Sequence, residues 1–395
     1  MKDDSVTISA GHSAGPTGAN QLVLWADDPA TEDHAYLSQQ LITCIGNKRA
    51  LLGHIGAAVR KVKSRLGKER LRVLDAFSGS GVVSRFLKAH AAYLAASDIE
   101  DFAIVTARCF LSDRTSIAVD ELRLLIQNLN EKVDDARLGT GFIEELYAPR
   151  DDDRIRKGDR VFYTRRNARR LDNYRRLIES APEPYRDLLL GPLLSEASVH
   201  ANTAGVFKGF YKDRHTQIGR FGGSNGDALS RIKGEIVLDM PVLSRFGCDV
   251  EVVQEDANKV VRQVQNLDLA YFDPPYNQHP YGSNYFMLNL LVRYERPQRI
   301  SKVSGIPVNW RRSDYNVRSR ALPCLRELVH NVDAKFILLS FNNEGFVRPD
   351  EMRRMLSEIG RVDVIEAPYN TFRGSRNLRN RTIHVTEQLF LVERR

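Results

Sequence analysis

The sequence contains little cysteine, and its four cysteines stand far apart. They form no CxxC pair and have no histidine cluster nearby; their positions are Cys44, Cys109, Cys248 and Cys324. Structural zinc sites and disulfide scaffolds depend on closely spaced ligands or an oxidising compartment, so the sequence argues against both classes. We predict reduced thiols and no bound metal.

Long apolar runs are also missing. The opening Met1-Lys2-Asp3-Asp4-Ser5 lacks the apolar core of a secretory signal, and no run approaches the roughly 20 apolar residues that a membrane helix needs. Residues 1–34 are rich in small and polar residues without periodicity, which predicts a mobile N-terminal extension. We expect a soluble, cytoplasmic protein that does not bind membranes.

Acidic residues are the minority among the charged ones. The 395 residues include 58 lysines and arginines against 50 aspartates and glutamates, a formal net charge of +8. A basic balance favours a polyanionic partner such as nucleic acid. With 42% hydrophobic residues, the chain is long enough to bury a sizeable core.

The most informative segment is an apolar run followed by an acid, two prolines and an aromatic residue. The run Leu267–Phe272 predicts a buried strand of a parallel sheet, and Asp273, Pro274, Pro275 and Tyr276 follow it directly. Because proline fixes φ and lacks an N–H group, the carboxylate of Asp273 and the carbonyl of Pro274 can be held as acceptors. Two acceptors beside the ring of Tyr276 suit a planar base that carries an exocyclic amine.

A second strand-like run, Leu71–Phe77, leads through a glycine-containing bend into a helix-like stretch, Val82–His90. Gly79 and Gly81 lie in the bend, where the absence of a Cβ lets the backbone approach a ligand closely. Asp75, near the strand end, carries a negative charge that suits the ammonium of a methionine moiety and repels a pyrophosphate. The segment therefore predicts a cofactor site.

Asp98 ends the next strand-like run, about twenty residues further on. A carboxylate at that place accepts hydrogen bonds from ribose hydroxyls in nicotinamide and in methionine cofactors alike, so Asp98 does not choose between them. A nicotinamide-dependent oxidoreductase would explain Gly79, Gly81 and Asp98, although it leaves Asp273 to Tyr276 unexplained. An acidic helix cap is the plain alternative for Asp98.

The order of these segments resembles the D12 class of DNA adenine methyltransferases over nearly all of the chain beyond residue 36. In that class a Gly-Asn-Lys segment comes first, here Gly46-Asn47-Lys48, and an FxGxG loop follows, here Phe77 to Gly81. A long insertion, the DPPY segment and a C-terminal half-sheet come next. Leu339–Gly345 and Glu387–Leu391 fit the last part.

The resemblance implies S-adenosyl-L-methionine as the cofactor and the exocyclic amine of a flipped base in double-stranded DNA as the target. It implies catalysis by Asp273, Pro274, Pro275 and Tyr276. It also implies that Lys48 reaches the cofactor carboxylate and that Asp256 contacts the cofactor's adenine, unless Asp256 only caps a helix. The full predicted cofactor set is Cys44, Lys48, Asp75, Phe77, Gly79, Gly81, Asp98, Asp256 and Asp273.

Three questions stay open at this point. The DPPY segment tolerates cytosine N4 as well as adenine N6. Cys44 occupies a position where related enzymes place an aromatic residue, so its contact is doubtful. The enzyme either serves a restriction–modification system, alongside a cognate endonuclease that acts separately, or works as an orphan methylase.

Strand-like runs alternate with helical patterns, which predicts a doubly wound α/β sheet. The resemblance implies seven strands, the last one antiparallel. The predicted strands are Leu71–Phe77, Tyr93–Ile99, Asp249–Gln254, Leu267–Phe272, Lys335–Phe341, Val362–Ala367 and Gln388–Val392. We assign residues 35–108 and 247–395 to the catalytic, cofactor-binding domain and residues 109–246 to an inserted target-recognition domain.

Basic residues interleaved with aromatic ones predict the DNA contacts. In the insertion these are Lys208, Tyr211, Lys212, Arg214 and Arg220; elsewhere they are Arg311 and Arg312 after the DPPY segment, and Arg373, Arg376 and Arg379 between the last two strands. The arginine pairs of residues 165–176 fit either a DNA-facing surface or a helix face paired with Asp151–Asp153 and Asp172.

Overall fold

The computed structural model describes residues 32, 34–39, 41–42, 44, 48–223, 226–343, 345–370 and 384–395. Gly46 and Asn47, almost all of the predicted N-terminal extension, and Arg373, Arg376 and Arg379 lie outside these residues. Among the helices described, none is long and apolar enough to cross a membrane.

A seven-stranded sheet forms the centre of the catalytic part, in the order β3-β2-β1-β4-β5-β7-β6. Strands β1 to β5 pair in parallel, whereas β7 lies antiparallel between β5 and β6. The doubly wound sheet and its antiparallel last strand are confirmed. The strands are β1 (Leu71–Asp75), β2 (Ala91–Asp98), β3 (Asp249–Gln254), β4 (Leu267–Phe272), β5 (Ala334–Asn342), β6 (Gly360–Asn370) and β7 (His384–Arg394).

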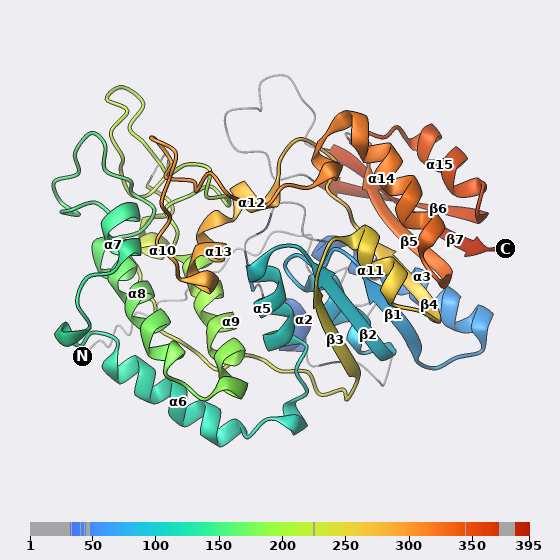
Figure 1. Cartoon of the computed structure of the whole chain (residues 1–395), viewed down its shortest axis with the longest axis horizontal. Coiled ribbons are helices and arrows are strands. Elements are labelled where there is room, and N and C mark those ends of the chain that lie inside the picture. Colours follow the sequence, from blue (N-terminus) through green and yellow to red (C-terminus); the bar gives the residue numbers. More distant parts are fainter. Residues whose placement is uncertain are drawn as a thin grey trace, which may run out of the picture.

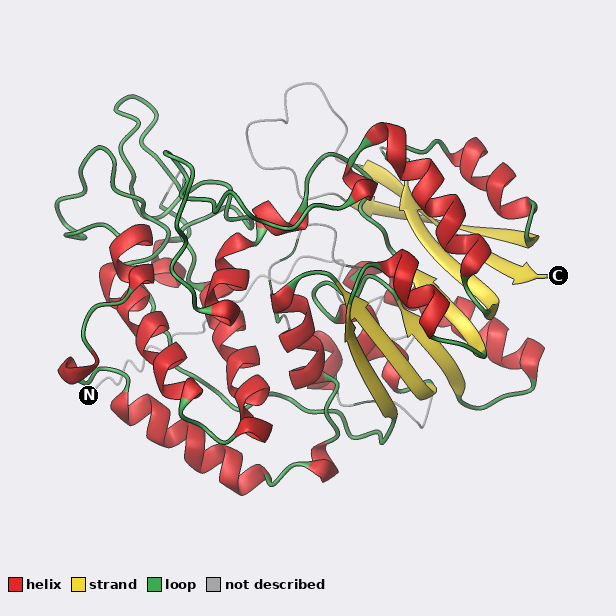
Figure 2. Cartoon of the chain, in the orientation of Figure 1, coloured by secondary structure: helices red, strands yellow, loops and turns green. Residues whose placement is uncertain are grey.

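Helices cover both faces of this sheet (Figure 2). On one face lie α3 (Leu52–Leu66), α4 (Val82–Lys88) and the end of α5 (Asp101–Phe110); on the other lie α11 (Ala257–Gln263), α14 (Arg318–Asn331) and α15 (Pro349–Ser357). Strand β4 is buried along its whole length. Its side chains alternate between the two apolar layers, Leu269 and Tyr271 in one and Ala270 and Phe272 in the other, which explains the apolar run Leu269–Phe272.

The insertion is helical and lies on the opposite side of the molecule from the strands (Figure 1). Its helices are α6 (Val119–Lys132), α7 (Phe142–Tyr147), α8 (Arg165–Glu179), α9 (Glu183–Val199) and α10 (Leu229–Lys233). Their apolar core is continuous with α5 and with α13 (Phe286–Arg293), both from the predicted catalytic part. Gly191 of α9 packs so tightly on α5 that an added Cβ would stand 2.5 Å from the sulfur of Cys109.

The arginine pairs of α8 form ion pairs within the protein, and of Arg165, Arg166, Arg169 and Arg170 the last alone is buried. Arg165 and Arg169 pair with Glu144, while Arg166 and Arg170 pair with Asp134 and Glu235. The acidic partners differ from those considered in the sequence analysis. Asp152 accepts from the backbone N–H of Arg165, and Asp172 accepts from the backbone of Ile143 and Glu144 and from the Tyr294 hydroxyl. These ion pairs join segments that lie far apart in the sequence, so the spacing of the arginines does not reveal them.

Short elements connect the main ones: α2 (His34–Ser38), α12 (Tyr281–Asn284), and the 3-10 helices η2 (Arg49–Leu51), η3 (Arg114–Ser116), η4 (Ala136–Leu138) and η5 (Asp314–Asn316). The strand order reverses between β1 and β4, because the chain continues from β1 to β2 on one side and from β4 to β5 on the other. Loops diverge at such a point and leave a crevice outside the carboxyl ends of the strands. The candidate site lies there.

Candidate active site

The loop between β1 and α4 forms one wall of the site. Gly79 and Gly81 adopt φ angles of 49° and 74°, in the left-handed region that favours glycine. The N–H of Gly79 donates to Asp98 Oδ2 over 2.9 Å, and the N–H of Glu100 donates to Asp98 Oδ1 over 2.9 Å. Asp98 therefore fixes the glycine loop to the end of β2 while its carboxylate also lines the pocket.

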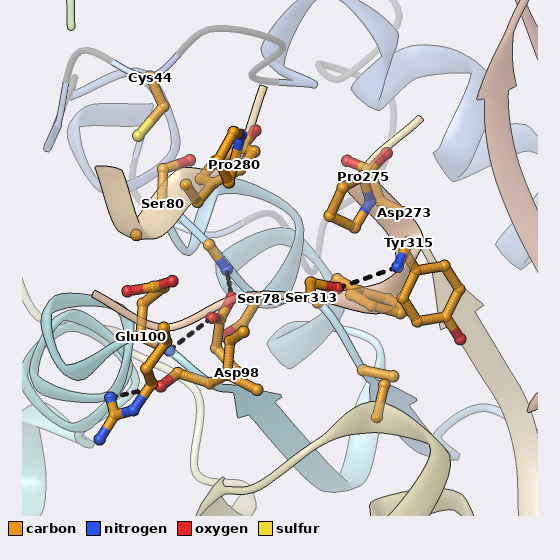
Figure 3. Close-up of a pocket in the computed structure, with 18 of the residues that line it drawn as sticks. Cys44, Ser78, Ser80, Asp98, Glu100, Asp273, Pro275, Pro280, Ser313 and Tyr315 are labelled. Atoms are coloured by element: carbon orange, nitrogen blue, oxygen red, sulfur yellow. Dashed lines mark hydrogen bonds between the residues drawn. The ribbon is translucent and has the colours of Figure 1, made fainter. Parts of the chain in front are cut away.

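The pocket beside this loop is enclosed by the ends of β1, β2 and β4 and by residues 311–316. Asp98 and Glu100 lie on one side of it, and Asp273 and Pro275 lie on the other (Figure 3). The hydroxyls of Ser78 and Tyr271 are buried in the wall and have no hydrogen-bond partner among the described residues. Unsatisfied buried hydroxyls are costly, so these two atoms fit a pocket that a polar ligand completes.

Seven of the predicted cofactor residues line this pocket: Cys44, Lys48, Phe77, Gly79, Asp98, Asp256 and Asp273. Asp75 and Gly81 do not line it. Asp75 accepts from the Ser84 hydroxyl over 2.5 Å, and its burial raises the pKa of the carboxyl to about 7, which makes it a poor partner for an ammonium. Gly81 is the N-cap residue directly before α4. Both residues shape the loop from behind.

Asp256 caps a helix, as one of the two interpretations expected, and its contact with the cofactor's adenine stays a prediction. Its Oδ1 accepts from the N–H of Asn258 over 2.9 Å and caps α11, and the residue also lines the pocket. A carboxylate has enough lone pairs for both contacts. Nearby, Tyr315 meets the ring of Phe77 edge to face at 5.3 Å between centroids, so the two rings form an apolar wall.

Arg311 was predicted to contact DNA, and the structure places it in the wall of this first pocket. Its guanidinium donates to the carbonyl of Ile99 over 2.5 Å and to Asp101 over 2.8 Å. Its neighbour Arg312 instead lies over the ring of Trp310, with 4.2 Å between the guanidinium carbon and the ring centroid. The two adjacent arginines therefore have different surroundings.

Glu100 is a pocket residue that the sequence analysis missed. It is 2% exposed and accepts from the side-chain amide of Asn289 over 2.5 Å. Burial, and then the neighbouring Asp98, raise the pKa of its carboxyl to about 7. The signal was present in the sequence, since Asp98-Ile99-Glu100 places a second acid two positions after the first.

Lys48 lies between the carboxylates of Asp273 and Glu387. Its Nζ is 3.0 Å from Asp273 Oδ1 and 3.1 Å from Glu387 Oε1, and it also bonds to the Tyr276 hydroxyl. Only 4% of its side chain is exposed. Burial alone would lower the pKa of Lys48, but the carboxylates of Asp273 and Glu387 raise it above the usual value. The ammonium therefore stays charged. We call Lys48, Asp273, Tyr276 and Glu387 the Lys48 cluster.

A second cavity lies on the other side of the DPPY segment. Its wall shares Asp273, Pro275 and Tyr281 with the first pocket and adds Val206, Lys208, Pro274, Tyr276, Asn277, His279 and Asn284. The N–H of Phe207 donates to the carbonyl of Asn284 over 2.7 Å, which fixes the insertion segment of Lys208 against α12. Two ligands bound in the two cavities would therefore meet at Asp273.

The comparisons with known proteins identify the family. The sequence model for the D12 class of N6 adenine-specific DNA methyltransferases matches residues 45–355. The chain belongs to this class. Adenine N6 is therefore the target atom and S-adenosylmethionine the methyl donor of this methyltransferase, and the cytosine and nicotinamide alternatives are set aside.

Three relatives match most of the methyltransferase. The type II methyltransferase M.NlaIII of Neisseria lactamica is 26% identical over 360 residues, which cover 89% of this chain and 98% of the relative. M.CviAII of Paramecium bursaria Chlorella virus 1 is 25% identical over 82% of this chain and 93% of its own. The modification methylase StsI of Streptococcus sanguinis is 28% identical over 89% of this chain, which spans about half (52%) of that longer protein.

The pKa of Asp273 predicts how the methylation rate depends on pH. Burial raises the pKa of its carboxyl, Lys48 lowers it, and Glu387 raises it again, which brings it to about 6. Only the ionised carboxylate accepts hydrogen bonds with both oxygens, so the single-turnover rate is expected to fall as the pH drops below about 6. Tritiated-methyl transfer at saturating DNA and cofactor measures this rate, and circular dichroism at each pH controls for unfolding. A rate that stays constant down to about pH 5 contradicts the assignment.

Proposed function

We propose that the first pocket holds S-adenosylmethionine and that the second cavity receives the target adenine after it has flipped out of the DNA duplex. The observation that carries this proposal is the shared position of Asp273 and Pro275 in both walls. Enzymes that modify a base cannot reach its atoms inside the stack, so the base has to be extruded. A shared wall lets the amine and the methyl donor meet at one carboxylate.

The residues of the DPPY segment act by positioning and electrostatics. The lone pair of the adenine amine is delocalised into the ring, so the amine is a weak nucleophile. The carboxylate of Asp273 and the carbonyl of Pro274 accept the two N6 hydrogens and draw the nitrogen toward a tetrahedral shape. The cofactor supplies a sulfonium-activated methyl group. The N6 proton becomes acidic only as the new C–N bond forms, so Asp273 can receive it without being a strong base.

We propose that residues 109–246 recognise the target DNA sequence and that a turn around Arg214 contacts its base edges. Lys212 and Gly219 form an isolated antiparallel bridge. Between them, the Asp213 carboxylate accepts from the N–H groups of His215 and Thr216 and orders the turn. Arg214 is exposed on this ordered turn. An exposed arginine on a fixed backbone suits bidentate contact with a guanine edge in the major groove.

Arg214→Ala is therefore expected to relax the sequence preference at one base position by about 1–3 kcal/mol, without changing cofactor affinity. Competition binding with a cognate duplex and with single-base variants of it, at several salt concentrations, measures this effect. The matched control is Arg123→Ala on α6. This substitution removes an exposed arginine that forms an ion pair with Asp120. An equal loss of affinity for every duplex indicates instead that Arg214 holds a phosphate.

One experiment tests the proposed function as a whole. The methyltransferase is expressed in a host that lacks DNA methylation, and the modified bases are mapped by single-molecule sequencing. The expected result is N6-methyladenine within one short motif. We propose further that the enzyme acts in the cytoplasm as the modification partner of a separate restriction endonuclease. Protection of the mapped motif against an endonuclease from the same source tests that point.

A further inference from the structure

We propose that Glu387 is a positioning residue for the methyl transfer, which shares the Lys48 ammonium with Asp273 and so keeps Asp273 available for the adenine amine. The inference rests on the proposed role of Asp273 and adds to it. Glu387 lies 114 positions after Asp273 in the sequence and belongs to β7. Its carboxylate is buried, with 2% of the residue exposed.

The contacts of Glu387 place it opposite Asp273 in a nearly symmetric arrangement. Lys48 Nζ is 3.0 Å from Asp273 and 3.1 Å from Glu387, and the Tyr276 hydroxyl is 3.2 Å from each carboxylate. The Ser340 hydroxyl of β5 donates to Glu387 over 2.8 Å from a fully buried position. Glu387 is thus held by two neighbouring strands, while Asp273 is held by the DPPY turn.

The charges of the Lys48 cluster explain why a second carboxylate matters. Two ionised carboxylates and one ammonium give a net charge of −1, whereas one carboxylate and one ammonium would form a neutral, closed ion pair. The amine nitrogen gains positive charge as the C–N bond forms, and a fixed negative charge nearby stabilises this positive charge in the transition state. A neutral pair would instead leave Lys48 in competition with the amine for the lone pairs of Asp273.

Several titratable groups face Asp273, and the test has to separate Glu387 from them. They are Lys48, Tyr271, Tyr276, Tyr281, Asp75 and Glu387. Among these, Glu387 is the acid that raises the pKa of Asp273 most directly, because both contact the same ammonium. Removal of its charge is therefore expected to lower the pKa of Asp273, since a like charge has been withdrawn.

The decisive variant is Glu387→Gln, which keeps the shape of the side chain and removes its charge. We expect kcat to fall at least about tenfold. We also expect the acid limb of the pH–rate profile to move to lower pH, and the dissociation constant of S-adenosylhomocysteine to change by less than about threefold. The matched control is Glu366→Gln on the adjacent β6. The carboxylate of Glu366 is exposed, and among the described residues it accepts one hydrogen bond, from the side-chain amide of Gln388. A purely structural role predicts a lower melting temperature with an unmoved acid limb, and that outcome overturns the inference.

Glu387→Asp provides the test if the glutamine variant does not fold. The shorter side chain keeps the charge but withdraws it from Lys48, so the acid limb is expected to stay near its wild-type pH while kcat falls. Wild-type kcat in this variant overturns the inference. The proposed function fails separately: if Asp273→Ala remains active, the role of Asp273 is wrong, whereas an inactive Asp273→Ala beside an unaffected Glu387→Gln overturns only the role of Glu387.

Discussion

Asp273→Ala is expected to abolish DNA methylation, with a loss of at least about a thousandfold in the single-turnover rate. The reason is that Asp273 serves the amine in the transition state, where its contact strengthens as positive charge develops on N6. Cofactor affinity should weaken by no more than about tenfold, ~1.4 kcal/mol, because the rest of the pocket wall remains. The fold should persist, since Lys48 keeps its ion pair with Glu387.

Tritiated-methyl transfer and calorimetry with S-adenosylhomocysteine measure the two effects of this substitution. The matched control is Asp249→Ala, which removes an exposed aspartate at the amino end of β3, away from the ligand-binding edge of the sheet. Turnover above about a tenth of the wild-type value in Asp273→Ala would refute the catalytic assignment.

Asp98→Ala is expected to weaken cofactor binding at least about a hundredfold, ~2.7 kcal/mol. The carboxylate has two tasks, because it lines the pocket and also accepts the N–H groups of Gly79 and Glu100. Its removal leaves both N–H groups without that acceptor and loosens the glycine loop, and each unsatisfied group costs about 1–3 kcal/mol. DNA affinity in the absence of cofactor should not change.

Calorimetry with S-adenosylhomocysteine and fluorescence anisotropy with labelled DNA separate these effects for Asp98. Asp120→Ala on α6 is the control, because 92% of that side chain is exposed. If DNA affinity falls while cofactor affinity stays the same, the glycine loop belongs to the DNA interface and the assignment of Asp98 is wrong.

The sequence predicted the centre of the fold better than its edges. Strand β4 begins and ends where predicted, because helices bury both of its faces and Asp273, Pro274 and Pro275 follow it. Strands β6 and β7 are longer than predicted, since they pair with each other along their full length and carry charged residues on the exposed side. β1 is two residues shorter than predicted, because the backbone turns at Ala76 to form the glycine loop.

The candidate site was predictable where local motifs carry it. The glycine loop and the DPPY segment are contiguous, and the structure brings both to one crevice, although the individual site roles stay predictions. Contacts that join distant segments could not be read in this way. Lys48 and Tyr276 are 228 positions apart, and Ser340 and Glu387 meet only because β7 lies beside β5. The ion-pair partners of the α8 arginines were hidden for the same reason.

The continuity of the insertion core with α5 and α13 limits how new specificities can arise in this enzyme. A chimera joined at residues 109 and 246 would cut through α5 and separate Phe102, Ala103 and Val105 from the insertion core in which they pack. The helical insertion is therefore not an exchangeable cassette. Variation that spares this core can accumulate in the exposed turn of residues 214–217. A library confined to that turn tests the recognition role proposed for Arg214 while the catalytic core is retained.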